Sequence, residues 1–246
     1  MTAAGRRRSY VLVTPRTFDA RERYPVVLAF HGDGATGDSL RGYFRVESFT
    51  GEDALVVYPD AAGAGRAWDL ETRASKPNAD VDFVRALVAE LVASRSADAT
   101  HVFATGWSNG GFFVSTLACR APSLVRAIAS HAGGAPYDVD DKPPLAFSNG
   151  YVRCIEGQTG VPAFVVHGAV DRTVTPDSGD FNALYWAFVN GCDVQAAKTP
   201  RPGRPECGAY SCPAGHDVTY CRPAALGHGI WEHGARESWD WFARLR

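Results

Sequence analysis

The sequence contains no long apolar run and almost no excess of charge of either sign. No stretch approaches the ~18 consecutive apolar residues that a membrane-spanning helix requires, so we expect no membrane partner. The 25 basic residues stand against 27 acidic ones, and this net charge of −2 gives no electrostatic basis for binding nucleic acid. Internal repeats and low-complexity linkers are also missing. A composition of 46% hydrophobic and 21% charged residues excludes a disordered, collagen-like or coiled-coil protein.

The amino-terminal segment lacks the apolar core of a signal peptide. Arg6-Arg7-Arg8 resembles the basic start of such a peptide, but the apolar stretch at residues 10–13 is too short and Pro15 follows it. We interpret the three arginines as a solvated run of charge that leads into a first strand. A secreted precursor whose signal was removed and replaced by Met1 is also compatible with this sequence.

Short apolar runs alternate with helical patterns along the chain. The apolar runs predict buried strands, and several have no polar face, as in a parallel sheet covered on both sides. These runs are residues 26–30, 54–58, 101–105, 125–130 and 163–167. The helical patterns comprise a helix capped by Asp80, whose apolar face extends to Leu91, and residues 109–120, 178–190 and 235–245. This order predicts an α/β fold with a doubly wound, mostly parallel sheet and helices on both faces.

One stretch interrupts the alternation. Residues 132–160 are rich in Gly, Pro and Asp and show no clear periodicity. Loops of this length in compact domains are usually functional or loosely ordered. The stretch is too short to be a separate lid, so we expect residues 1–246 to form a single domain without a large lid domain.

Six cysteines suggest an oxidising compartment, and hence a secreted or periplasmic protein. The segments 205–211 and 217–222 flank a turn at Ala214, and a hairpin about this turn places Cys207 opposite Cys221, close enough for a disulfide. Cys192 with Cys212, and Cys119 with Cys154, are the remaining pairs that we assign. A zinc site built from Cys192, Cys207, Cys212 and Cys221 is the alternative, although none of their spacings is C-x-x-C.

A candidate nucleophile lies where a predicted strand turns into a predicted helix. Gly106-Trp107-Ser108-Asn109-Gly110 matches the pattern G-x-S-x-G and lies between the strand that ends at Thr105 and the helix that follows. Such a turn, called a nucleophile elbow, holds a serine hydroxyl clear of the sheet, and its glycines permit a backbone too tight for side chains. A packing turn with an incidental serine is the alternative interpretation.

Serine needs a base, and in this architecture the acid and the histidine follow later strands. Asp171 comes just after the strand that ends near His167, and His228 lies between two glycines after the last predicted strand. His233 is the competing base, whereas Asp177 and Asp180 look like residues at the start of a helix. We therefore predict Ser108 as nucleophile, His228 as base and Asp171 as the acid that orients it.

A further strand end supplies a candidate oxyanion hole. His31-Gly32-Asp33-Gly34 directly follows the strand that ends at Phe30. The small residues of this turn allow backbone N–H groups to point into the site. We expect the N–H groups of Asp33 and Asn109 to bind the oxyanion, each such donor being worth about 3 kcal/mol in the transition state.

Together these features resemble the α/β-hydrolase superfamily, and within it the group of feruloyl esterases, acetyl xylan esterases and polyhydroxybutyrate depolymerases. The resemblance extends over nearly the whole chain and is carried by short segments. They are Arg8-Ser9-Tyr10, His31-Gly32, Val57-Tyr58-Pro59-Asp60, Asp80-Val81-Asp82-Phe83, Ser108-Asn109-Gly110-Gly111, Leu117-Ala118-Cys119, His167-Gly168 with Asp171, and Gly227-His228 with Trp231.

The resemblance implies the same three catalytic residues, disulfides and secretion. It also has two departures. The group usually has Gly-His-x-Trp-Pro, but here Gly229-Ile230 precede Trp231 and Glu232 replaces the proline. The loop 132–160 is longer than the usual connection. Both departures concern the wall of the substrate site, to which we assign Trp107, Trp231 and His31.

The activity that we predict is hydrolysis of carboxylic esters through an acyl-enzyme, with no metal and no organic cofactor. The resemblance implies release of feruloyl or acetyl groups from plant polysaccharide esters. A polyester or hydroxybutyrate-oligomer hydrolase is the first alternative, and a hydrolase-fold binding protein without turnover is the second. The expected partner is an ester on a small molecule, polysaccharide or polyester, and the sequence leaves the oligomeric state open.

Overall fold

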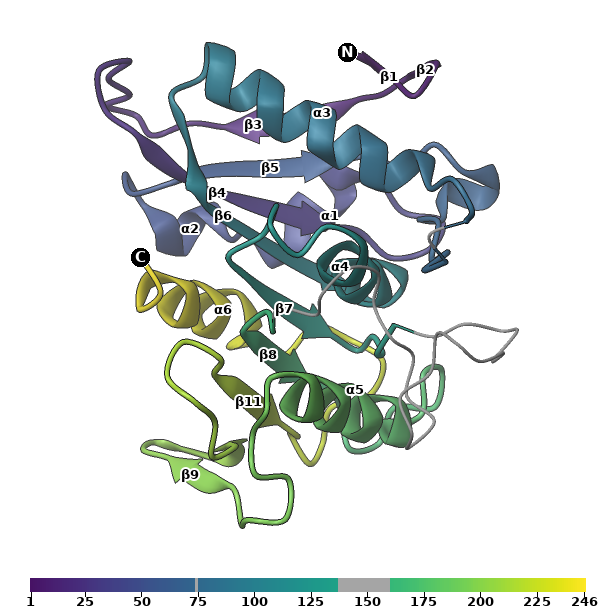
Figure 1. Cartoon of the computed structure of the whole chain (residues 1–246), viewed down its shortest axis with the longest axis vertical. Helices are drawn as coiled ribbons and strands as arrows, with labels where there is room; N and C mark the ends of the chain where they lie inside the picture. The colour runs from purple at the N-terminus through teal and green to yellow at the C-terminus, as the bar shows by residue number, and fades with distance from the viewer. Residues whose placement is uncertain (74, 137–159) are drawn as a thin grey trace.

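The computed structural model describes residues 1–73, 75–136 and 160–246 (Figure 1). A short ribbon pairs β1 (Thr2–Ala3) with β2 (Arg6–Arg7). The main sheet has nine strands. In spatial order they are β3 (Tyr10–Val13), β5 (Leu55–Pro59), β4 (Tyr24–Phe30), β6 (Ala97–Trp107), β7 (Ala127–His131), β8 (Ala163–Val166), β11 (Val218–Cys221), β10 (Arg204–Ala209) and β9 (Thr199–Arg201).

The middle of the sheet is parallel and both edges are antiparallel. Strands β5, β4, β6, β7, β8 and β11 pair in parallel with their neighbours. At one edge β3 runs antiparallel to β5, and at the other β10 runs antiparallel to β11 and to β9. Every apolar run that we predicted as a strand overlaps a strand of this sheet. The predicted α/β class with a doubly wound, mostly parallel sheet is therefore confirmed.

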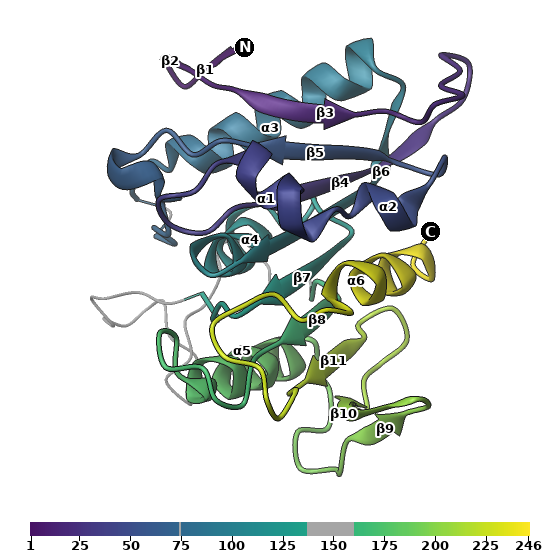
Figure 2. The ribbon, with the colours of Figure 1, turned by 180° about the vertical axis from the view of Figure 1, so that it is seen from behind.

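Helices cover both faces of the sheet. One face carries α3 (Ala79–Ser94), α4 (Asn109–Arg120) and α5 (Pro176–Val189) (Figure 1). The other carries α1 (Gly37–Phe44), α2 (Glu47–Thr50) and α6 (Gly234–Ala243) (Figure 2). A 3₁₀ turn at Ala64–Arg66 completes the helical elements that the structure describes. A hydrophobic core lies on each face of the sheet. Because side chains alternate along a strand, β4 contributes to both: Leu28 packs on the side of α3 and α4, and Val27 on the side of α1 and α6.

Two expectations for the amino-terminal region are wrong. The cap of α3 is Asn78, whose side chain accepts the N–H groups of Asp80 and Val81, because only a residue that precedes the first turn can reach those donors. Asp80 instead pairs with Arg8 at 2.6 Å, and both side chains are buried. Arg8 also lies over the ring of Phe83, so it is an internal cation and not part of a solvated run.

The hairpin near the carboxyl end forms in the predicted register. Cys207 lies opposite Cys221 in the β10–β11 pair, and the two residues form a disulfide. A second disulfide joins Cys192 to Cys212. All four sulfurs of the alternative zinc site are therefore consumed in disulfides. The prediction that pairs Cys119 with Cys154 involves a residue outside the described part of the chain.

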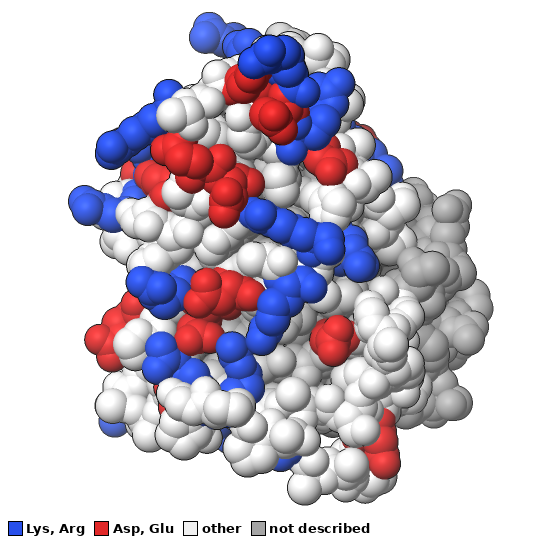
Figure 3. Space-filling view, turned by 90° about the vertical axis from the view of Figure 1, so that its left-hand side faces the viewer, with Lys and Arg blue, Asp and Glu red and all other residues white. Residues whose placement is uncertain are grey.

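Charge is mixed on the face of the molecule that Figure 3 displays, where basic and acidic side chains are interspersed over the surface. Within residues 1–73, 75–136 and 160–246, no helix is both long and apolar enough to cross a bilayer.

A buried histidine at the end of β7 makes the stability of the fold depend on pH. The Nε2 of His131 lies 2.9 Å from the hydroxyl of Ser238, which itself donates to the carbonyl of Gly234. The imidazole therefore donates from Nε2 and is neutral, and burial lowers its pKa from 6.5 to about 3. The unfolded chain binds a proton at this histidine below pH 6.5, whereas the folded chain does not until about pH 3.

As the pH is lowered from 6.5 to 3, we expect the free energy of unfolding to decrease by about 1.4 kcal/mol per pH unit because of His131. Urea unfolding at pH 7, 6 and 5 measures this loss for the native protein and for His131→Gln, which keeps a polar group near Ser238. The free energy of unfolding of the variant should decrease by about 1.4 kcal/mol less per pH unit than that of the native protein, because one fewer proton is taken up on unfolding. Parallel curves for the two proteins would contradict the assignment.

Candidate active site

The end of β6 and the start of α4 hold Ser108 in a strained backbone conformation. Its φ of 56° and ψ of −121° lie in a region of backbone conformation that residues other than glycine rarely adopt. The neighbouring glycines make the turn possible. A Cβ at Gly106 would lie 2.2 Å from the carbonyl oxygen of Gly110, and one at Gly110 would lie 2.2 Å from that of Phe30. The N–H of Ser108 donates to the carbonyl of His131 at 2.9 Å, which joins the elbow to β7.

The structure brings together the three residues that we predicted as a triad. His228 Nε2 lies 2.9 Å from Ser108 Oγ, and His228 Nδ1 lies 2.8 Å from Asp171 Oδ2. The carboxylate is fully buried, while the imidazole is 16% exposed and reaches the surface beside the serine. The competing base His233 lies near Glu232 at the start of α6. The geometry therefore selects His228 as the partner of Ser108.

The loops that carry the acid and the base are hydrogen-bonded to each other. Ala169 N–H donates to the carbonyl of Pro223 at 3.0 Å, and Val170 N–H donates to that of Leu226 at 3.1 Å. Gly168 permits this approach, since a Cβ there would lie 2.2 Å from the Leu226 carbonyl oxygen. Two loops far apart in sequence thus hold Asp171 and His228 in register.

Local hydrogen bonds keep the acid ionised. Burial acts to raise the pKa of Asp171, but the hydrogen bond from His228 and the N–H groups of Thr173 and Val174 outweigh it, so the pKa lies below its ordinary value. His167 orders the same turn. Its Nε2 lies 2.9 Å from the carbonyl of Val174 and 3.5 Å from Asp171. A permanent carboxylate can stabilise an imidazolium at His228.

The turn after β4 lies directly beside the nucleophile. A Cβ at Gly32 would lie 3.3 Å from the Cβ of Ser108 and 2.8 Å from the ring of Trp107, so only glycine leaves room here. Asp33, the next residue, is exposed. We assigned the N–H groups of Asp33 and Asn109 to an oxyanion, and neither donates to a protein acceptor within the part of the chain that the structure describes.

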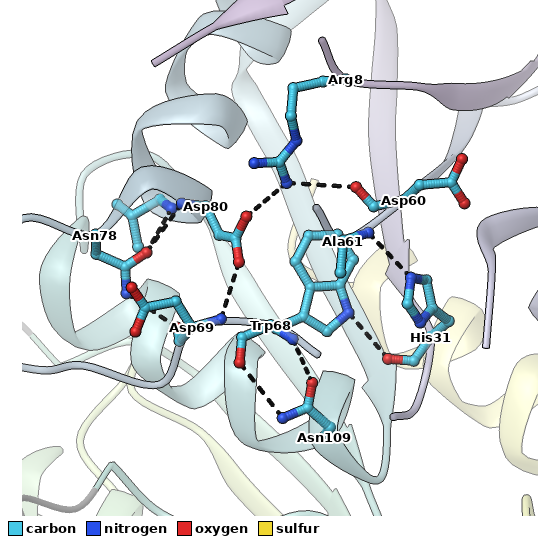
Figure 4. A network of polar contacts seen from close by, with 10 residues as sticks. Arg8, His31, Asp60, Ala61, Trp68, Asp69, Asn78, Asp80 and Asn109 are labelled. Atoms are coloured by element: carbon cyan, nitrogen blue, oxygen red, sulfur yellow. Dashed lines mark hydrogen bonds and ion pairs between the residues drawn. The ribbon is translucent and has the colours of Figure 1, made fainter. Parts of the chain in front are cut away.

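A polar network behind the site holds the segment that carries Asn109 (Figure 4). Asn109 Oδ1 accepts the backbone N–H of Trp68 at 2.6 Å, and the indole N–H of Trp68 donates to the carbonyl of His31 at 3.0 Å. The next residue, Asp69, donates its N–H to Asp80, which also pairs with Arg8. The network thus connects the turn after β4 and the start of α4 to the buried ion pair between Arg8 and Asp80.

One residue that we assigned to the wall of the substrate site lies in the interior instead. His31, which we assigned to substrate binding, is fully buried. Its Nε2 accepts the N–H of Ala61 and its Nδ1 donates to the carbonyl of Gly32, so the ring braces the turn and is not available to a substrate. Trp68 is also buried, stacked on Phe113, because its indole completes the core beneath the elbow.

Trp107 lies against the catalytic histidine, and Trp231 lines a nearby hollow. The ring of Trp107 lies 5.2 Å from that of His228 and meets Tyr43 edge to face at 6.0 Å. Trp231 is nearly buried and forms part of the wall of a hollow of about 350 Å³ that also includes Tyr43. Sequence reasoning missed Tyr43, and its position as an aromatic residue in the last turn of an amphipathic helix was the only available signal.

The arrangement places a hydroxyl, an imidazole and a buried carboxylate in one line of hydrogen bonds. In the part of the chain that the structure describes, no group of three or more His, Cys, Asp or Glu residues is placed to hold a metal ion.

The chain is similar in sequence to known proteins. A family model described as the prolyl oligopeptidase family matches residues 40–145. The probable feruloyl esterase C of Aspergillus niger is 26% identical over 202 residues, which are 80% of this chain and 67% of the relative. Acetylxylan esterase A of Aspergillus oryzae is 24% identical over 215 residues, 76% of this chain and 68% of the relative. The chain spans about two thirds of the length of the curated feruloyl esterases that it matches.

Solved structures show the fold. The acetyl xylan esterase from Aspergillus awamori superposes with a TM-score of 0.76 at 20% identity, over 95% of this chain and 93% of the other. The protein has the α/β-hydrolase fold. The carboxylesterase from Bacillus cereus, with a TM-score of 0.61 at 13% identity over 97% and 95% of the two chains, shares it. The predicted fold is therefore confirmed, and the sequence relatives named as esterases confirm the predicted resemblance.

Proposed function

We propose that this α/β-hydrolase-fold chain is a serine carboxylic-ester hydrolase that works through an acyl-enzyme. The observation that carries the proposal is the line of hydrogen bonds from Ser108 through His228 to Asp171, at 2.9 and 2.8 Å. Sequence relatives named as esterases support the same conclusion. A binding protein without turnover would have no need of a strained serine aligned with a base and a buried acid.

The proposed reaction has two halves. Ser108 Oγ attacks the ester carbonyl while its proton passes to His228 Nε2, and the oxyanion forms beside the N–H groups of Asp33 and Asn109. The imidazolium, stabilised by Asp171, then gives this proton to the departing alcohol as the carbon–oxygen bond of the ester breaks. Water attacks the acyl-enzyme by the same route, which releases the carboxylic acid and restores the serine.

We propose feruloyl or acetyl esters of plant polysaccharides as the substrates. The support is the naming of the relatives as feruloyl and acetylxylan esterases. Secretion, or export to the periplasm, fits the same picture, since the two disulfides at Cys192–Cys212 and Cys207–Cys221 persist in oxidising compartments.

The proposal is tested by labelling and turnover together. A fluorophosphonate probe should attach to one residue, Ser108, as read by mass spectrometry of the peptides. The protein should also release acid from methyl ferulate or from acetylated xylan. Labelling at another serine, or turnover without any labelling, would refute the assignment. Turnover only of a hydroxybutyrate trimer would keep the mechanism and move the substrate to the polyester class.

A further inference from the structure

One loop contacts both segments that carry the proposed oxyanion donors. This bridging loop, residues 60–69, follows β5 and is bonded to the turn after β4, which carries Asp33, and to the start of α4, which carries Asn109 (Figure 4). An oxyanion hole requires donors held in a fixed arrangement, since a displacement of about 1 Å can cost about 10²-fold in rate. The loop is therefore placed to set the position of the two donors relative to each other.

The bridging loop binds the backbone on both sides of Asp33. On one side, the indole N–H of Trp68 donates to the carbonyl of His31 at 3.0 Å. On the other side, Gly34 N–H donates to the carbonyl of Gly65 at 3.1 Å. The N–H of Asp33 thus lies between two points at which the turn is bonded to the loop.

Trp68 carries the second link, which leads to the nucleophile elbow. Its N–H donates to Asn109 Oδ1 at 2.6 Å and its carbonyl accepts from Asn109 Nδ2 at 3.5 Å, so the asparagine side chain pairs with the loop backbone in both directions. The indole is buried, stacked on Phe113 and edge to face with Phe30. One packed residue therefore binds the elbow through its backbone and the turn after β4 through its side chain.

The ion pair between Arg8 and Asp80 holds both ends of the bridging loop. Arg8 Nη2 donates to the carbonyl of Asp60, the first residue of the loop, at 3.3 Å. The same nitrogen lies 2.6 Å from Asp80 Oδ1, and Asp80 Oδ2 accepts the N–H of Asp69, the last residue of the loop, at 2.9 Å. Two buried side chains thus tie the ends of the loop to each other (Figure 4).

The pair is poorly built as a source of stability. Nε and Nη1 of Arg8 are buried and find no hydrogen-bond partner among the residues that the structure describes. A buried cation with unpaired donors loses hydration that one carboxylate replaces only in part, and apolar side chains in place of such a pair often leave a protein equally or more stable. The ion pair is therefore better explained by what it positions.

We propose that the Arg8–Asp80 pair is a positioning element of the oxyanion hole, an inference that rests on the proposed esterase function. By fixing both ends of the bridging loop, the pair keeps Trp68 in place, and Trp68 sets the N–H groups of Asp33 and Asn109 for a tetrahedral oxyanion. The side chains of Arg8 and Asp80 are buried, so they act on the rate only through these backbone donors.

The variants interrupt this chain of contacts at two points. Trp68→Phe removes the indole N–H but keeps an aromatic ring in the core. Trp186→Phe is its matched control, because the buried Trp186 loses an equivalent bond, from its indole N–H to the hydroxyl of Ser115, in α5. Arg8→Met combined with Asp80→Leu removes both charges together, so that neither stays buried alone. Arg8→Lys keeps a charged donor and tests rescue.

We expect Trp68→Phe and the double variant to lower kcat for 4-nitrophenyl acetate by about 10-fold or more and to leave KM within about 2-fold. Acylation and deacylation both pass through an oxyanion, whose charge develops only in the transition state. The inhibition constant of phenylboronic acid, which forms a tetrahedral anion on a catalytic serine, should rise by a similar factor. Arg8→Lys should recover at least about 3-fold of the lost kcat, and Trp186→Phe should change kcat less than 2-fold.

The pH dependence of kcat/KM distinguishes positioning from a general defect of the site. The contacts of the bridging loop that carry the proposal include neither Asp171 nor His228, so the midpoint should be the same in the native protein and in both variants. Urea unfolding shows that each variant is folded during the assay. A shifted midpoint, an equal loss of kcat in Trp68→Phe and Trp186→Phe, or a folded double variant with native kcat would overturn the proposal.

Hydrogen–deuterium exchange separates this inference from the esterase proposal. Peptides that cover residues 31–36 and 60–69 should exchange about 10-fold faster in the double variant than in the native protein, whereas peptides from α6 should not change. This pattern without ester turnover by the native protein would refute the esterase proposal and retain the ion pair as the support of the loop. Ester turnover by the native protein, with unchanged exchange in the double variant, would overturn this inference alone.

Discussion

Replacing Ser108 with alanine should lower ester hydrolysis by about 10⁶-fold, the loss typical of removing the nucleophile of a serine hydrolase. His228 Nε2 lies 2.9 Å from this hydroxyl, so its removal leaves the base without the nucleophile that it activates. The measurement is kcat/KM for methyl ferulate and 4-nitrophenyl acetate with the purified variant. Fluorophosphonate labelling should disappear in parallel.

A second variant separates chemistry from folding. Ser108→Gly removes the same hydroxyl but suits a φ of 56°, so it should be as inactive as Ser108→Ala and more stable by about 1 kcal/mol. Thermal and urea unfolding report the difference. If either variant retained more than a hundredth of the native rate, Ser108 would not be the nucleophile, and the site would have to be reassigned.

Replacing Asp171 with asparagine should lower kcat by about 10⁴-fold and leave KM within a few-fold, as expected when the base adopts the wrong tautomer. The carbonyl of asparagine can keep the bonds that Oδ1 accepts from Thr173 and Val174, which places its amide nitrogen against His228. An amide donor at that point favours the tautomer protonated at Nε2. That nitrogen could then no longer take the proton of Ser108.

Asp177→Asn is the matched control for this substitution. Asp177 follows the same strand and was an alternative acid in the sequence, but it lies in the first turn of α5, fully exposed. Its loss should change kcat less than 2-fold. Retention of more than a tenth of the native activity in Asp171→Asn, or an equal defect in Asp177→Asn, would show that Asp171 does not orient the base.

The candidate site was readable from the sequence because parallel strands place their carboxyl ends at one edge of a sheet. Ser108, Asp171 and His228 each follow a predicted strand, so predicting the strands was enough to predict that these three residues meet. The same reasoning located Gly32 beside the serine. The hairpin about Ala214 followed similarly, since antiparallel pairing converts sequence spacing into the register of Cys207 and Cys221.

Buried charge was not readable in this way. Arg8 stands in a run of three arginines, and nothing local distinguishes it from Arg6 and Arg7, which are exposed. Its partner Asp80 is remote in the chain and was mistaken for a helix cap. Both errors have one cause: an ion pair between distant residues depends on how α3 packs over the sheet, and sequence periodicity does not report that packing.

The roles of the aromatic residues depended on packing as well. His31 and Trp68 are buried and brace the turn after β4, whereas Trp107 lies against His228, and Tyr43 and Trp231 line one hollow. The side chain that each residue contacts is set by neighbours from other elements. The sequence alone therefore does not show whether a tryptophan beside a catalytic motif faces the substrate or the core.

The sequence by itself determined the class of sheet, the elbow at Ser108 and the chain order of its two partners, because strand and turn propensities are local and strand ends converge. Only the tertiary structure decided that Arg8 and His31 are internal supports and that Tyr43 contacts Trp107 and lines a hollow with Trp231. Burial, desolvation and cavity shape arise from contacts among residues far apart in the chain, which no local pattern specifies.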